Sequence, residues 1–129
     1  IVRITEATNL LNNSYFEAVL ELSGVGAGSG NAISLEQGSS YRLVNLFQKA
    51  AQRTHVKITT RGRGPHADLN IQQGFGERTA LTTYISWDGS DQYVHTPFDT
   101  FDSIDPKKLK LCGQTTLLVT SVLSREPTY

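Results

Sequence analysis

A strand-helix-strand pattern in the middle of the chain constrains the fold more than any other feature. Asn31–Glu36 and Val56–Thr60 are both predicted to be short strands. Between them, apolar residues such as Leu43 and Phe47 recur at helical spacing and predict an amphipathic helix over Tyr41–Arg53. Strands that alternate with helices favour a layered α/β domain with a mostly parallel or mixed sheet.

Two further strands and a second helix extend this pattern. Phe16–Leu22 alternates apolar and polar residues, and Thr79–Trp87 is the strongest strand prediction because it is rich in β-branched and aromatic residues. Asp88–Asp105 is a long polar loop, and ordered loops of this length are often functional. An Asp-Pro pair at its end matches the N-cap and first position of a helix over Lys107–Ser124.

Composition narrows the classes of protein further. The length of 129 residues predicts one domain over residues 1–129. Twelve Lys and Arg balance twelve Asp and Glu, which argues against nucleic acid or an anionic membrane as partner. No apolar run approaches the ~18–20 residues of a bilayer span. The chain begins at Ile1 and has no Met, which predicts a processed product, a trimmed chain or a fragment.

The single cysteine, Cys112, excludes an internal disulfide and a cysteine-rich zinc site, and it leaves the compartment undetermined. Cys112 falls among apolar residues of the last predicted helix. A thiol in that position is typical of a buried small residue rather than of a nucleophile.

Four glycines alternate in the segment 24–30, directly after the first predicted strand. Their spacing does not form a dinucleotide-binding motif, because Ser29 and Asn31 occupy the positions where the third glycine would be needed. No helix is predicted directly after the segment to offer its N-terminus to a phosphate. The segment therefore predicts a flexible exit from the strand.

His95 lies in the segment YVHTPFDT, shortly after the strongest predicted strand. Ligand sites in open α/β sheets favour the carboxyl ends of strands. Imidazole is a common zinc ligand, and carboxylates such as those of Asp99 and Asp102 can orient it. A surface histidine beside helix-capping aspartates is the alternative, and the residues by themselves favour that interpretation.

The segment from Tyr93 to Pro127 resembles the C-terminal end of peptidase family M28, the zinc aminopeptidases. It contains the family's His-Thr-Pro-x-Asp-Thr signature at 95–100 and an Ile-Asp-Pro helix start at 104–106. Weaker similarity extends back to Phe16: FEAVLELSGVGAG resembles the family's Asn-Leu-Asp-Met-x-Gly strand, and GRGPHAD resembles its Gly-x-Ser-Asp-His turn.

The resemblance implies a three-layer α/β fold with a central mixed, mostly parallel sheet flanked by helices. It also implies zinc as cofactor and a two-metal site that activates water to hydrolyse an N-terminal peptide bond. By the same resemblance, His95 binds one zinc ion, and Tyr93 and Asp99 line the site or orient its ligands.

Several positions depart from the family pattern. Ser23 stands where the resemblance expects an aspartate ligand, and a neutral serine is a poor zinc ligand. Glu21 offers a carboxylate on the same strand face, one residue pair earlier. His66 and Asp68 do not preserve the order of the Ser-Asp-His turn. The family's other ligands belong to an N-terminal half that has no counterpart before Phe16, and one histidine cannot hold zinc.

Three functional hypotheses follow. In the first, the chain is the C-terminal half of such a peptidase and is not catalytic alone. Its partner is then the missing N-terminal half or a second copy of the chain, which pairs with an exposed edge of the sheet. The completed site would act on a peptide substrate. Alternatively, it is a degenerate, non-enzymatic binding or scaffolding module, which Ser23 favours. The third is an active hydrolase with an unfamiliar ligand set from His95, His66, Asp68 and Glu21.

Overall fold

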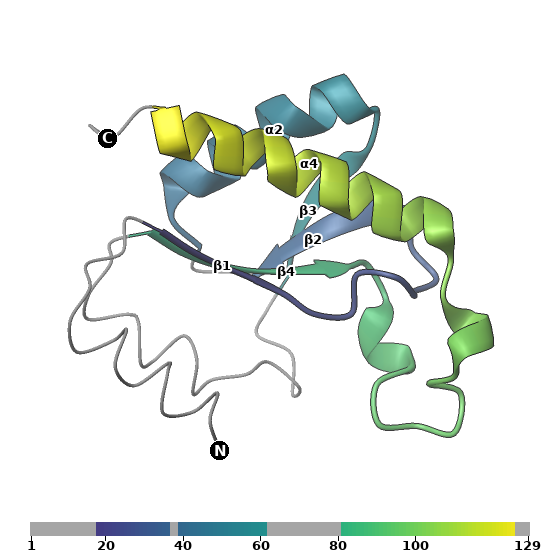
Figure 1. Cartoon of the computed structure of the whole chain (residues 1–129). Helices are drawn as coiled ribbons and strands as arrows, with labels where there is room; N and C mark the ends of the chain where they lie inside the picture. Colours follow the sequence, from purple (N-terminus) through teal and green to yellow (C-terminus); the bar gives the residue numbers. More distant parts are fainter. Residues whose placement is uncertain (1–17, 37–38, 62–80, 126–129) are drawn as a thin grey trace, which may run out of the picture.

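The structure, a computed structural model, describes residues 18–36, 39–61 and 81–125. Within these ranges lie four strands, two α-helices and two short 3-10 helices (Figure 1): β1 (Ala18–Leu22), β2 (Ala32–Glu36), α2 (Tyr41–Thr54), β3 (Lys57–Arg61), β4 (Leu81–Trp87), η1 (Ser90–Gln92), η2 (Phe101–Ser103) and α4 (Pro106–Arg125). The strands and helices predicted for these ranges are confirmed, with small shifts at their ends. The loop predicted as irregular contains the two 3-10 helices.

The four strands form one mixed sheet in the order β1-β4-β2-β3. β1 runs parallel to β4, and β2 runs parallel to β3. Only the central pair, β2 with β4, is antiparallel. The prediction of an α/β domain with a mixed, mostly parallel sheet is therefore confirmed. Because β1 and β4 point the same way, their carboxyl ends meet at one edge of the sheet.

The hydrophobic core lies between the sheet and the two helices. α2 and α4 lie side by side over the same face of the sheet (Figure 1), and the hydroxyl oxygens of Thr54 in α2 and Thr115 in α4 are 2.8 Å apart. The following residues, all fully buried, form the centre of this core: Ile33, Leu35, Leu43, Phe47, Ile85 and Cys112. Cys112 is buried, as predicted, and its burial raises the pKa of its thiol to about 11.

The opposite face of the sheet is polar, and its centre is also buried. Ser34 of β2 and Ser86 of β4 are register partners, and both are fully buried. Tyr84 and Glu36 share this face and are nearly inaccessible. The sheet is thus buried on both faces over its two central strands, as in layered α/β domains. The described helices form one layer, so the third layer implied by the resemblance is not found within the described ranges.

The helix ends follow the sequence signals. Asp105 precedes Pro106 and caps α4, because its Oδ1 accepts a hydrogen bond of 2.9 Å from the backbone N–H of Lys107. α2 ends at Thr54 and is capped by His55, which has a left-handed backbone with φ of 57° and whose N–H donates to the carbonyl oxygen of Ala51. Of the helices in the described ranges, none combines the length and hydrophobicity that a bilayer span requires.

Candidate functional site

The candidate site lies at the edge of the sheet where β1 and β4 end. The backbone N–H of Ser23 donates to the carbonyl of Ile85 over 3.0 Å, and the N–H of Trp87 donates to the carbonyl of Gly24 over 3.0 Å. The pairing of the two strands therefore continues into the glycine-rich segment. Both this segment and the loop that contains His95 start from the same edge, which is where parallel strands usually place ligand sites.

The glycine-rich segment is fixed in place by hydrogen bonds to β4 and α4. The N–H of Gly30 donates to the carbonyl of Asp88 over 3.0 Å, and the Nε1–H of Trp87 donates to the carbonyl of Gly30 over 2.7 Å. At the other end, the N–H of Asp105 donates to the carbonyl of Gly26 over 2.8 Å. The prediction of a flexible strand exit is wrong for this reason: the segment ties β1, β4 and the start of α4 together.

Two glycines of this segment are required by space as well as by conformation. Gly24 has a φ of 67°, and a Cβ there would lie 2.9 Å from Oγ of Ser90. Gly28 has a φ of 150°, and a Cβ there would lie 2.4 Å from the carbonyl oxygen of Asp88. A backbone oxygen cannot move aside as a flexible side chain can, so Gly28 is the stricter requirement.

Lys108 joins this region from the first turn of α4. Its ammonium donates to the carbonyl of Gly28 over 2.5 Å and lies 5.7 Å from the centre of the Trp87 ring. Trp87 itself is 4% exposed. The partly buried cation thus combines a charge-assisted hydrogen bond with a cation–π contact.

We expect Lys108→Met to lower the free energy of unfolding by about 1–2 kcal/mol, because it removes both contacts while keeping the apolar stem. The measurement is urea denaturation followed by the fluorescence of Trp87, the only tryptophan in the chain. Lys107→Met, at the exposed neighbouring position, is the matched control. Equal destabilisation by the two substitutions would contradict the assigned role of Lys108.

Hydrogen bonds within the loop between β4 and α4 shape the turn that contains His95. The Thr96 hydroxyl donates to the carbonyl of Tyr93 over 2.6 Å and accepts from the N–H of Phe98 over 3.2 Å. The N–H of Asp99 donates to the carbonyl of Thr96 over 3.1 Å. The threonine of the His-Thr-Pro motif therefore holds the turn that follows the histidine.

His95 is exposed and has a left-handed backbone with φ of 57°. Few residues other than glycine adopt this conformation, and histidine is among those that tolerate it best. Backbone conformations of this kind are concentrated at functional sites. Tyr93, two residues before His95, is half-buried, and Asp99, four residues after it, is exposed. The turn thus presents the imidazole toward solvent.

The remaining candidates lie in β1 or outside the described ranges. Ser23 is half-buried at the end of β1, and Glu21 is half-buried and pairs in register with Tyr84 on the polar face of the sheet. His66 and Asp68 lie outside the described residues. The structure therefore brings Ser23 and the loop of His95 to one edge of the sheet, and it leaves the positions of the other two candidates untested.

The donors in the described ranges do not assemble a metal site among themselves. Within residues 18–36, 39–61 and 81–125, no three His, Cys, Asp or Glu side chains are grouped closely enough to share a metal ion. Ser23 offers a neutral hydroxyl in place of the expected carboxylate. We therefore derive no hydrolytic step from these residues.

Acidic and basic residues are separated between different elements of the fold, although their numbers are equal over the whole chain. The loop between β4 and α4 contains five aspartates and no Lys or Arg: Asp88, Asp91, Asp99, Asp102 and Asp105. α2 and α4 contain no Asp or Glu, and their basic residues are Arg42, Lys49, Arg53, Lys107, Lys108, Lys110 and Arg125. Counting charge element by element would have found this separation in the sequence.

Comparison with known proteins adds no assignment. No protein-family model matches the chain, and neither a curated protein nor a solved structure matches it significantly.

Proposed function

We propose that this chain is the C-terminal part of a zinc-aminopeptidase-like α/β domain and that it is not catalytic by itself. One observation carries the proposal. The motif from His95 to Thr100 follows β4, and β4 is the parallel neighbour of β1, which ends directly before Ser23, where the resemblance expects an aspartate ligand. Ser23 and the loop that contains His95 are distant in sequence, yet both follow strands that end at the same edge of the sheet, as a shared site requires.

The proposal includes a source for the missing donors. Zinc in proteins takes three or four protein ligands, and a serine at position 23 does not supply one of them. The N-terminal half of such a domain, or a second copy of this chain, would provide them. β1 and β3 form the two edges of the sheet made by the described strands. An edge strand offers a row of backbone hydrogen-bonding groups with which another chain can pair.

A second candidate function is a non-enzymatic binding module of the same fold. Large aromatic side chains on the loop after β4 favour it, because Phe98 is 71% exposed and Phe101 is 87% exposed. Exposed aromatic residues are enriched in protein interfaces. In this alternative, the loop has kept its shape as a contact surface and Ser23 marks the loss of the metal site.

We expect the chain to retain well below one zinc ion after metal loading and desalting, as measured by elemental analysis. Ser23→Asp is expected to raise the retained zinc, because it restores a carboxylate at the edge that His95 shares. The gain is expected to disappear when His95→Asn is added, since asparagine tolerates the left-handed backbone but removes the imidazole. Ser23→Asn is the neutral control for the first substitution.

His55→Asn is the matched control for the histidine, because His55 has the same φ of 57° at the end of α2. If Ser23→Asp retains no more zinc than Ser23→Asn, the resemblance has not located a metal site. That result would favour the alternative function of a non-enzymatic binding module. If the unsubstituted chain retains about one zinc that only His95→Asn removes, the chain binds metal by itself, and aminopeptidase assays would decide whether it is catalytic.

A further inference from the structure

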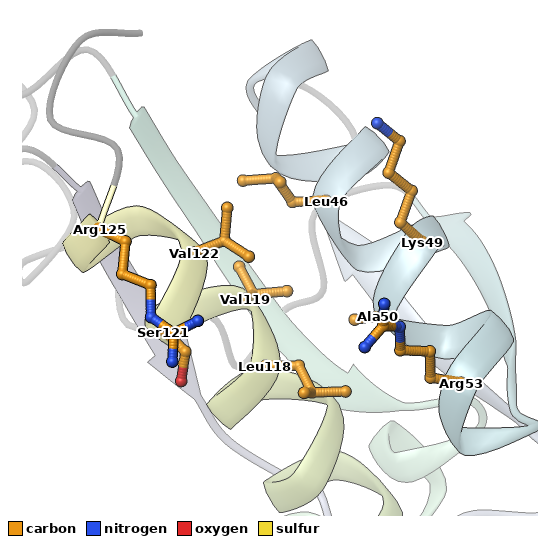
Figure 2. A pocket seen from close by; sticks show the side chains of 9 residues that line it. All are labelled: Leu46, Lys49, Ala50, Arg53, Leu118, Val119, Ser121, Val122 and Arg125. Carbon is orange, nitrogen blue, oxygen red and sulfur yellow. The ribbon is translucent and has the colours of Figure 1, made fainter.

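A groove of about 470 Å³ opens between α2 and α4 (Figure 2). Its floor is apolar: Leu46 and Ala50 of α2 face Leu118, Val119 and Val122 of α4. Ala50 and Val119 also belong to the hydrophobic core, so the floor of the groove is continuous with that core. Leu46, Leu118 and Val122 are only half-buried and remain accessible from the groove.

The rim of the groove is basic on both sides. Lys49 and Arg53 extend from α2, Arg125 extends from α4, and all three are exposed. Figure 2 shows the two guanidinium groups on opposite sides of the groove. None of the nine side chains that line it is acidic. The groove therefore offers an apolar strip between two positive borders.

The two helices run in opposite directions along the groove. Thr54 of α2 contacts Thr115 of α4, whereas Leu46, earlier in α2, shares the groove with Val122 and Arg125, later in α4. From Leu46 to Arg53 the groove follows about two turns of α2, or about 11 Å at a rise of ~1.5 Å per residue. An elongated strip of this length matches two turns of another helix.

We propose that this groove binds an acidic amphipathic helix of a partner protein. Such a helix places apolar side chains at i, i+3 or i+4, and i+7 into an apolar groove. Its flanking carboxylates would lie opposite Lys49 and Arg53 on one border and Arg125 on the other. A small anionic ligand fits less well, because pockets for small molecules enclose most of their ligand and converge their polar groups on one point. The proposal does not depend on the metal site or on the peptidase resemblance.

The test uses the full chain and a fluorescein-labelled helical peptide of about four turns, with leucines along one stripe and glutamates on both flanks. Binding is measured by fluorescence anisotropy. The matched peptide has lysine in place of every glutamate, and a second one has the same composition with the leucine stripe scrambled. We expect the acidic striped peptide to bind at least ten-fold more tightly than either of the others.

Arg53→Glu combined with Arg125→Glu is expected to weaken binding of the acidic peptide at least ten-fold, because both borders become repulsive. Lys107→Glu combined with Lys110→Glu is the matched control, since it changes the net charge equally at exposed positions of α4 outside the groove. We expect less than a three-fold effect from that control. Unchanged thermal unfolding of both double variants verifies that they fold.

Three results would overturn the proposal. Equal loss of binding in the two double variants would mean that only the overall charge matters. Equal binding of the acidic and basic peptides would mean that the contact is apolar and unselective. Absence of binding up to about 1 mM, which corresponds to only ~4 kcal/mol of binding free energy, would mean that the groove does not accept a helix.

Discussion

Gly28→Ala is expected to lower the free energy of unfolding by about 2–4 kcal/mol, because the added methyl group meets both a steric clash and an unfavourable backbone conformation. The added Cβ would lie 2.4 Å from the carbonyl oxygen of Asp88 and 2.9 Å from Cδ1 of Trp87. The backbone at φ of 150° is also unfavourable for alanine. Relief requires the segment to move away from β4, which would break the hydrogen bond from Lys108 to the Gly28 carbonyl.

The measurement is equilibrium urea denaturation with the fluorescence of Trp87 as the signal. Gly113→Ala provides a matched control, because Gly113 is exposed within α4 and a Cβ there meets nothing within 4 Å. That substitution is expected to stabilise the protein by about 0.5–1 kcal/mol through helix propensity. If Gly28→Ala and Gly113→Ala have the same effect, the glycine-rich segment is not packed against β4 as described.

Phe47→Ala is expected to destabilise the protein by about 3–5 kcal/mol, since it leaves a cavity in the layer between the sheet and the helices. Phe47 is fully buried and is the largest of the fully buried side chains within the described ranges. Its ring belongs to the same core cluster as Ile33, Ile85 and Val119, so both helices and both central strands would lose contacts. A loss of this size approaches the whole stability of many small domains.

Thermal unfolding measured by circular dichroism tests this expectation. Leu117→Ala is the control on α4, because Leu117 is 66% exposed, and a change within about 0.5 kcal/mol is expected there. Phe47→Leu, which refills part of the space, should fall between the two. A mild effect of Phe47→Ala would show that the helices can close over the cavity without cost.

Local patterns predicted the elements well because each element buries a recognisable set of side chains. The spacing of Leu43 and Phe47 identified α2, and the Asp-Pro pair before Lys107 identified the start of α4. Local patterns did not predict the order of the strands in the sheet. β1 lies beside β4 through register pairs such as Leu20 with Thr83, and a partner so distant in sequence leaves no local signal.

The candidate site was predictable only in part. The position of the loop of His95 at the carboxyl end of a strand followed from the sequence, and the structure agrees with it. The contacts of Gly28 did not follow, because they depend on a carbonyl of a distant strand end. The basic borders at Arg53 and Arg125 were missed because opposite charges elsewhere cancel them in the total for the chain.

The place of β4 in the sheet has a consequence for biosynthesis. Among the described strands, β1 pairs with β4 alone, whereas β2 and β3 are joined by the short crossover through α2. A ribosome makes β1 before β2, α2 and β3 and completes β4 after all three, so β1 waits for its neighbour while these elements are synthesised. During that interval its backbone groups are open to the strands of other nascent chains. Closing the β1–β4 pair therefore ends this exposure of β1 and also brings together the two strand ends at which the candidate site lies.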